Sequence, residues 1–188
     1  MKKIDNIIFI GIMGSGKTTI GKKTAKNLNY NFIDTDQEIE RITGMKISDI
    51  FRKEGELRFR SEETLALKRI KKGPPSVIAT GGGIVLKKEN RDLIKDMGIV
   101  IYLDADVDII TERVSRNKNR PLLRVENIRE KVKQLSEQRK DLYLEIADIV
   151  IDTGSDRFDN LLLKIEKEIK LFKQNKQQGG VSWKKLYL

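Results

Sequence analysis

In IIFIGIMGSGKT, residues 7–18, an apolar strand pattern runs directly into a phosphate-binding loop, and this is the clearest indication of the fold. The β-branched run Ile7–Ile10 is typical of a strand that is buried on both faces of a parallel sheet. Gly11–Thr18 follows at once and matches the pattern G-x-x-x-x-G-K-[ST] at every position. Its glycines let successive backbone N–H groups turn toward a phosphate, and the helix expected from Gly16 adds its positive end. The stretch therefore predicts a P-loop that binds ATP.

The side chains of this loop indicate how a nucleotide and a metal ion would be held. We expect Lys17 to hold β- and γ-phosphate oxygens during transfer, and Thr18 to supply a hydroxyl ligand to Mg²⁺. A chance match is the alternative, but the loop lies between the strongest strand signal and a helical pattern, as the chemistry requires. The residues predicted to bind ATP here are Gly14, Ser15, Gly16, Lys17, Thr18 and Thr19.

The rest of the chain repeats the alternation of short apolar runs and helical patterns, which indicates a doubly wound α/β domain. The expected strands are Ile7–Ile10, Asn31–Asp34, Ser76–Thr80, Ile99–Leu103 and Asp148–Asp152. The expected helices are Gly16–Leu28, Thr35–Ile42, Ser48–Arg52, Glu56–Lys71, Lys87–Asp96, Asp106–Arg116, Arg129–Ala147 and Arg157–Phe172. We expect a mobile loop over residues 117–127 and a tail of low order after Phe172. Ligands of such sheets bind beyond the carboxyl ends of the strands.

Composition narrows the chemistry that is possible. The 188 residues include no cysteine and no histidine, which excludes thiol nucleophiles, disulfides and histidine bases. A net charge of +10 invites a nucleic-acid function, but about half of the excess lies near the C-terminus and no RNA-binding motif appears. No signal peptide is evident, and no apolar stretch reaches the roughly 20 residues of a membrane helix. We expect a cytoplasmic monomer that binds neither nucleic acid nor membrane.

Two acids, Asp34 and Asp36, close the second strand in the run FIDTD. Residues two apart on an extended chain point the same way, so one acid can serve Mg²⁺ and the other the acceptor hydroxyl. Helix capping is the alternative, because Asp is a favoured N-cap residue. The preceding P-loop favours the functional interpretation. Asp104, which ends the fourth apolar run, resembles a Walker B acid and ranks below Asp34 as a metal ligand.

Three consecutive glycines, Gly81, Gly82 and Gly83, follow the third strand. Such a run is costly unless the backbone needs unusual torsions or a close approach. A flexible turn into the next helix is the alternative. We expect the triplet to form a loop of backbone donors for the acceptor substrate.

Arginines supply the remaining candidates. Arg60 lies three residues before Glu63 on one helical face, so that Glu63 can orient it. An Arg fork suits bidentate capture of a carboxylate, which applies to Arg60 and to Arg139, although a surface ion pair is the ordinary alternative. Arg120 lies in the expected mobile loop, where closure over the phosphates would stabilise transition-state charge. Arg116 and Arg124 are weaker candidates nearby.

Together these motifs resemble the shikimate kinase family from about residue 3 to about residue 172. The matches are GIMGSGKT at Gly11, DTD at Asp34, FR at Phe59–Arg60, TGGG at Thr80, RPLL at Arg120 and RxxxY from Arg139 to Tyr143. The resemblance implies a three-layer α/β/α P-loop kinase fold with a five-stranded parallel sheet in the order 2-3-1-4-5. It also implies a single domain over residues 1–172, with a substrate-binding insertion around 36–63 and a lid around 114–126. The tail, residues 173–188, departs from the family pattern.

The same resemblance implies transfer of the ATP γ-phosphate to the 3-hydroxyl of shikimate, in aromatic amino acid (chorismate) biosynthesis. Asp36 would hold the substrate hydroxyls and is the candidate base, while Asp34 would reach Mg²⁺ through water. Arg120 would be the lid arginine, and Arg116 would border the adenine with the turn after Asp152. The residues that would hold the shikimate carboxylate and hydroxyls are Arg60, Gly81, Gly82, Gly83 and Arg139, with Phe51 and Phe59 as pocket walls.

Two other functions remain open from the residues. One is a related small-molecule kinase that acts on gluconate or a nucleoside monophosphate, although no base-recognition site is evident for a nucleotide acceptor. The other is a basic nucleic-acid-binding or regulatory protein that retains the kinase fold. The presence of every proposed catalytic residue, Lys17, Asp36 and Arg120, argues against the second.

Overall fold

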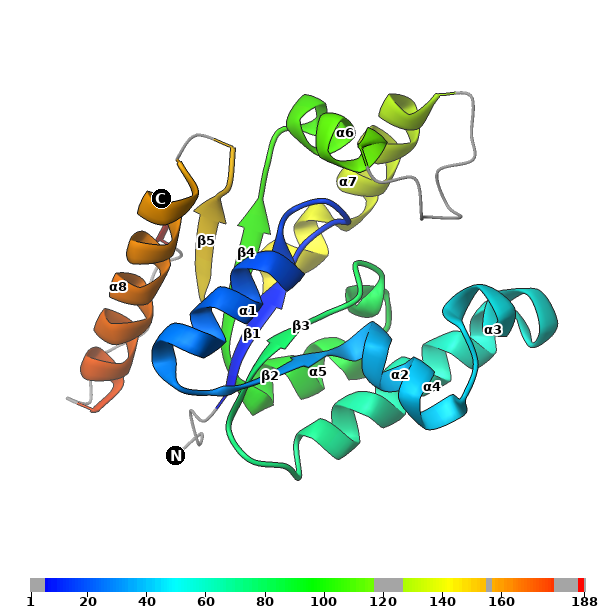
Figure 1. The fold of residues 1–188 in the computed structure, drawn as a ribbon, viewed down its shortest axis with the longest axis horizontal. Helices are drawn as coiled ribbons and strands as arrows, with labels where there is room; N and C mark the ends of the chain where they lie inside the picture. Colours follow the sequence, from blue (N-terminus) through cyan, green and yellow to red (C-terminus); the bar gives the residue numbers. More distant parts are fainter. Residues whose placement is uncertain (1–5, 117–126, 155–156, 178–185, 188) are drawn as a thin grey trace.

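The computed structural model describes residues 6–116, 127–154, 157–177 and 186–187, which form three layers around one parallel sheet (Figure 1). The strand order is β2-β3-β1-β4-β5-β6, and every neighbouring pair is parallel. The strands are β1 (Asn6–Ile10), β2 (Asn31–Asp34), β3 (Ser76–Ala79), β4 (Gly98–Asp104), β5 (Ile149–Asp152) and β6 (Leu186–Tyr187). The predicted order of the first five strands is confirmed.

The sixth strand comes from the C-terminal tail and was not predicted. Leu186 pairs with Ile149 and Tyr187 with Val150, so the tail adds to the edge of the sheet beside β5. The expectation of low order is therefore wrong for these two residues. An edge strand offers backbone N–H and C=O groups to any further strand, and β6 takes up that position.

Helices cover both faces of the sheet. They are α1 (Lys17–Leu28), α2 (Thr35–Thr43), α3 (Ile47–Lys53), α4 (Gly55–Ile70), α5 (Lys88–Met97), α6 (Val107–Ser115), α7 (Ile128–Ile146) and α8 (Phe158–Gln177), with a 3-10 turn η1 (Ile84–Leu86). Helices α1 and α8 pack on one face, and α4, α5 and α7 on the other, each through aliphatic side chains of the two core clusters. The predicted helices agree within a few residues, except that α8 continues past Phe172 to Gln177.

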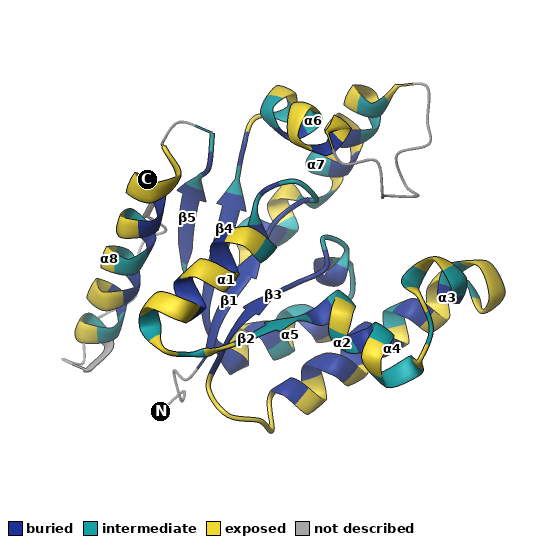
Figure 2. Cartoon of the chain, in the orientation of Figure 1, coloured by how far each residue is buried: buried dark blue, intermediate teal, exposed yellow. Residues whose placement is uncertain are grey.

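The central strands β1, β3 and β4 are buried on both faces, whereas β2 is only partly covered (Figure 2). Strand β2 is therefore less buried than β1, the strand for which burial on both faces was predicted. The reason is its place at the end of the strand order, where it pairs with β3 alone.

This topology brings three sequence motifs to one end of the sheet. Strands β2, β3 and β1 are neighbours, so the segments that follow them converge at their carboxyl ends. These segments are the DTD acids, the glycine triplet and the P-loop. The predicted insertion covers α2, α3 and the first half of α4. These helices share a small core of Ile39, Ile50 and Phe59, to which the second half of α4 adds Ala66. Residues 117–126, with most of the predicted lid and Arg120, lie outside the described part of the chain. No helix in the described ranges is long and apolar enough to cross a membrane.

Candidate active site

The P-loop curls between the end of β1 and the start of α1. Gly14 and Gly16 have φ values of 81° and 97°, a region that residues with a side chain rarely adopt, and Gly16 is the N-cap residue of α1. The Lys17 ammonium donates to the carbonyl oxygens of Gly11 and Ile12, both at 2.8 Å. Ser15 is buried in the loop, and Thr19 is exposed on α1. The loop therefore has its backbone bend and its cation in place.

Thr18 and Asp34 bring two oxygen atoms together beside the P-loop. The Thr18 hydroxyl donates to Asp34 Oδ2 at 2.9 Å. The other carboxylate oxygen of Asp34 accepts from the backbone N–H groups of Asp36 and Gln37 at the start of α2. Asp34 thus both caps a helix and reaches Thr18, so the two interpretations of this residue are compatible.

This pair of oxygens fits Mg²⁺, a hard cation that takes few protein ligands and completes its shell with water and substrate phosphates. Among the described residues, no group of three or more acidic or histidine side chains is placed to hold a metal by itself. A metal beside Thr18 and Asp34 would therefore depend on the nucleotide for its remaining ligands.

Asp104, the competing metal acid, is engaged in other bonds. Its Oδ1 accepts from the Tyr102 hydroxyl at 2.8 Å and from the Ala105 N–H at 3.0 Å. Its Oδ2 lies 3.4 Å from the Lys140 ammonium. The geometry favours Asp34 over Asp104 as the acid beside the P-loop threonine.

Asp36 lies in a different direction from the one predicted. Helix α2 begins at Thr35, so Asp36 is in its first turn rather than on an extended chain, and the argument from alternating side chains is wrong here. A Cβ added at Gly81 would lie 2.6 Å from Asp36 Oδ1. Asp36 therefore faces the glycine triplet, while Asp34 faces Thr18.

The glycine triplet is explained by close approach and not by unusual torsions. None of its members is among the positive-φ residues of the described chain, and Gly83 has an ordinary φ of −92°. However, a Cβ at Gly83 would lie 2.5 Å from Arg60 Nη1. Gly81 and Gly83 thus leave room for the side chains of Asp36 and Arg60.

Arg60 and Glu63 form a buried ion pair next to the triplet. Arg60 Nη1 donates to Glu63 Oε2 at 2.8 Å, which confirms the predicted orientation of Arg60 by Glu63, and Glu56 binds the other edge of the guanidinium. The Glu63 side chain is only 1% exposed. The pKa of Glu63 is raised to about 7, chiefly by burial and also by the Asp36 carboxylate, against the opposing effect of the Arg60 and Arg139 guanidinium groups.

The burial of Glu63 and its proximity to Asp36 and Arg139 were missed from the sequence. One signal was available: Glu63 lies on the helical stripe of Phe59, Ala66 and Leu67, all of which are buried. Phe59 also packs against Phe51, with ring centroids 4.7 Å apart, so the two predicted pocket walls do meet.

Helix α7 brings Arg139 to the same place. Tyr143, one helical turn later, donates its hydroxyl to the Gly82 carbonyl at 2.5 Å. Burial raises the pKa of Tyr143, against the smaller opposing effect of the nearby Arg139 guanidinium. Arg139 Nε is buried and has no hydrogen-bond partner among the described residues. A buried guanidinium N–H in that state is suited to an incoming anion.

The other predicted arginines are less well defined. Arg116 ends α6 and is exposed, in an ion pair with Glu112 at 2.5 Å. Arg113, which was not predicted to be a site residue, binds the hydroxyl and carbonyl of Thr153 at 3.0 and 2.7 Å. Arg113 thereby ties α6 to the turn after β5, the segment expected to border the adenine.

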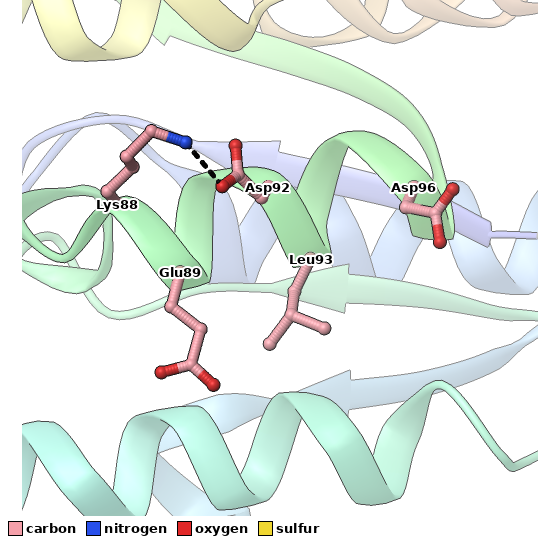
Figure 3. Close-up of a pocket in the computed structure, with 5 residues that line it drawn as sticks. All are labelled: Lys88, Glu89, Asp92, Leu93 and Asp96. Atoms are coloured by element: carbon pink, nitrogen blue, oxygen red, sulfur yellow. Dashed lines mark hydrogen bonds and ion pairs between the residues drawn. The ribbon is translucent and has the colours of Figure 1, made fainter.

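A hollow along α5 is separate from this site (Figure 3). Its charged residues are paired within the fold: Lys88 binds Asp92 at 2.7 Å, and Glu89 and Asp96 bind lysines of neighbouring segments. These are ordinary surface ion pairs, so the hollow adds nothing to the chemistry at the P-loop.

A built P-loop, a threonine–aspartate oxygen pair and two arginines beside a glycine loop define a P-loop phosphotransferase. A family model for shikimate kinase matches residues 13–170. The chain therefore belongs to the shikimate kinase family.

Relatives and solved structures agree with this assignment. The shikimate kinase of Thermodesulfovibrio yellowstonii is 47% identical over 163 residues, which cover 87% of this chain and 94% of the relative. The shikimate kinase of Pelotomaculum thermopropionicum is 44% identical over 160 residues, covering 85% and 92% of the two chains. The structure of shikimate kinase from Acinetobacter baumannii in complex with shikimate superposes with a TM-score of 0.85 at 42% identity, over 92% of this chain and 96% of that one.

Proposed function

We propose that this protein transfers the γ-phosphate of ATP to the 3-hydroxyl of shikimate, giving shikimate 3-phosphate and ADP in chorismate biosynthesis. The observation that carries the proposal is the arrangement of Arg60 and Arg139 around the glycine triplet, at the end of the sheet where the P-loop lies. A shikimate carboxylate matches two guanidinium groups, and its ring hydroxyls match carboxylate and backbone partners. The relative of known structure that binds shikimate supports the choice of acceptor.

The nucleotide is assigned to the P-loop. Backbone N–H groups from Gly14 to Thr18, with Thr19 on α1, would surround the phosphates, and Lys17 would leave its carbonyl partners for phosphate oxygens. Arg120 would close over the phosphates, and Arg116 would border the adenine. Thr18 directly and Asp34 through water would hold Mg²⁺, which neutralises phosphate charge when bound.

The acceptor is assigned to Asp36, Arg60, Arg139 and the triplet Gly81–Gly83. Transfer forms a bond between the 3-hydroxyl oxygen and the γ-phosphorus and breaks the bond from that phosphorus to the β–γ bridging oxygen, which leaves with ADP. Asp36 would hold the attacking hydroxyl and take its proton. The approach of Asp36 to Gly81 supports this role, since it directs the carboxylate to the triplet.

We also propose that the enzyme works as a monomer in the cytoplasm, where its ATP is supplied, without a nucleic-acid or membrane partner. Gel filtration at working concentration tests the first part. An elution volume of a dimer of this 21.6 kDa chain would contradict it.

The test of the activity is a coupled ADP-release assay with purified protein, ATP and Mg²⁺. Shikimate, gluconate, AMP and CMP are offered in turn, and Lys17→Met is the control for contaminating kinases. We expect turnover with shikimate alone, and its loss on addition of EDTA. Turnover with gluconate or a nucleotide and none with shikimate would overturn the proposal.

A further inference from the structure

The glycine triplet is fixed by buried hydroxyl groups from the helices around it. The N–H of Gly81 donates to Thr35 Oγ1 of α2 at 2.9 Å. The carbonyl of Gly82 accepts from the Tyr143 hydroxyl of α7 at 2.5 Å. Both side chains are fully buried, and neither is a candidate to touch a substrate in the proposed reaction.

The far end of the triplet is fixed by a longer chain of bonds. The Asn90 amide of α5 donates to the carbonyl of Ile84, directly after the triplet, at 3.1 Å. Its oxygen accepts from the Thr64 hydroxyl of α4 at 2.8 Å, and that hydroxyl in turn accepts from the Lys87 ammonium at 3.0 Å. Asn90 and Thr64 are also buried, so α4 is tied through α5 to the end of the loop.

Three of the helices that hold the triplet, α2, α4 and α7, also carry a residue proposed to hold the acceptor, whereas α5 supplies only the connecting residue Asn90. The pairs, anchor first, are Thr35 with Asp36, Thr64 with Arg60, and Tyr143 with Arg139. Two of the pairs are close together, since the Thr64 hydroxyl lies 3.2 Å from the Arg60 carbonyl and the Arg139 guanidinium is near enough to the Tyr143 hydroxyl to oppose the rise that burial causes in its pKa. Three helices from different parts of the sequence, α2, α4 and α7, are thus held in place relative to the same glycine triplet.

A plain hydrophobic core does not account for these residues. Val at the Thr positions or Phe at Tyr143 would fill nearly the same space without a hydroxyl that must be paired when it is buried. A fully paired buried network favours one geometry over others that pack equally well. That geometry matters here, because Asp36 and Arg60 approach Gly81 and Gly83 so closely that a Cβ added there would displace their end groups.

We infer that Thr35, Tyr143 and the Thr64–Asn90 pair are positioning residues, which hold the acceptor-binding side chains in place against the glycine triplet. They act on shikimate binding without touching it, and leave ATP binding to the P-loop. This inference rests on the proposed function, because shikimate is the ligand whose affinity reports the positioning.

The first test compares Tyr143→Phe with the matched variant Tyr102→Phe. Tyr102 stacks on Tyr143 with ring centroids 5.0 Å apart. Its substitution by Phe also removes a hydroxyl hydrogen bond, but the partner of that bond is Asp104 and not the triplet. Initial rates give KM for both substrates. We expect Tyr143→Phe to raise the shikimate KM about tenfold, the effect of one lost hydrogen bond, with the ATP KM changed less than about twofold. Tyr102→Phe should leave both KM values within about twofold of wild type.

The second test asks whether the anchors act through their partners. Tyr143→Phe is repeated in an Arg139→Ala background, and shikimate affinity is measured by titration calorimetry. In the Arg139→Ala background, we expect Tyr143→Phe to lower the shikimate affinity less than about twofold, because the residue that Tyr143 positions is gone. Thr64→Val should likewise raise the shikimate KM about fivefold, and Thr64→Ser should restore it.

The outcomes separate the two proposals. If the wild-type protein does not turn over shikimate, this result contradicts both the proposed function and the inference. Normal wild-type turnover with an unchanged shikimate KM in both Tyr143→Phe and Thr64→Val would sink the inference alone. Two further outcomes would show a general structural role and would also contradict the inference. One is an equal rise in the KM of both substrates. The other is an undiminished effect of Tyr143→Phe in the Arg139→Ala background. Thr64→Ser against Thr64→Val remains decisive if Tyr143→Phe does not fold.

Discussion

The two halves of this site are built in different ways. The proposed nucleotide half is one continuous stretch, Gly11–Thr18, in which backbone N–H groups and Lys17 would bind the phosphates. The proposed acceptor half is assembled from side chains on α2, α4 and α7 around a glycine triplet. A phosphate chain presents the same oxygens in every nucleotide, so backbone donors are sufficient for it. A particular polyhydroxy acid requires particular side chains, and these must be held in place by buried bonds.

Lys17→Met should have the largest effect on catalysis, because it removes the cation of the nucleotide half. We expect kcat to fall by about a thousandfold or more, as for loss of a group that stabilises transition-state charge. The measurement is ADP release at saturating shikimate. A thermal melt by circular dichroism serves as the control for folding, since Lys17 also bonds to two loop carbonyls. Turnover near that of wild type would remove Lys17 from the reaction.

Arg139→Ala should have the next largest effect and should appear only on the acceptor side. Loss of a charge-assisted bond to a carboxylate is expected to raise the shikimate KM roughly 10- to 100-fold, with the ATP KM within about twofold. The matched control is Arg129→Ala on the same helix, whose guanidinium forms an exposed ion pair with Asp108. An unchanged shikimate KM in Arg139→Ala would exclude this arginine from the acceptor half.

Gly83→Ala tests the close approach of the triplet to Arg60. The added Cβ would lie 2.5 Å from Arg60 Nη1, so the guanidinium must move. We expect the shikimate KM to rise about fivefold to tenfold through this misplacement. Gly73→Ala is the control, since its Cβ would meet nothing closer than a carbonyl oxygen at 3.3 Å and lies outside both halves. Equal kinetics for the two variants would contradict the proposed crowding.

Glu63→Gln should have the smallest effect on turnover, and its signature is the pH dependence of stability. The pKa of Glu63 is raised to about 7 in the folded protein, so the folded state holds this proton more tightly than the unfolded chain does. Its contribution to the free energy of unfolding is therefore full below about pH 4.5 and is lost as the pH rises through about 7.

Urea unfolding of wild type and Glu63→Gln at pH 5, 6 and 7 measures this contribution. Between pH 5 and 7, we expect the wild type to lose on the order of 2 kcal/mol of stability relative to the variant. Parallel curves for the two proteins would show that Glu63 is ionised in the folded state across this range.

The same contrast explains what the sequence could reveal. The P-loop was predictable because its residues are contiguous and flanked by clear strand and helix patterns. The strand order and most helix bounds followed from the resemblance and from apolar periodicity. The directions of Asp34 and Asp36 were not predictable from alternation, because α2 begins between them at Thr35.

The acceptor half was predictable only as a set of candidate residues. Nothing local in the sequence indicates that the Tyr143 hydroxyl binds the Gly82 carbonyl, or that Asn90 connects Thr64 to Ile84. Those bonds depend on how α4, α5 and α7 pack on one face of the sheet. The burial of Glu63 lies between these cases, since it follows from the apolar stripe of α4.

Equilibrium binding of each substrate to the two key variants tests the separation of the halves most directly. In titration calorimetry, Lys17→Met should have a shikimate Kd within about twofold of wild type and a strongly raised ATP Kd. Arg139→Ala should have a strongly raised shikimate Kd and an ATP Kd within about twofold of wild type. Loss of both ligands in both variants would contradict two independently built halves.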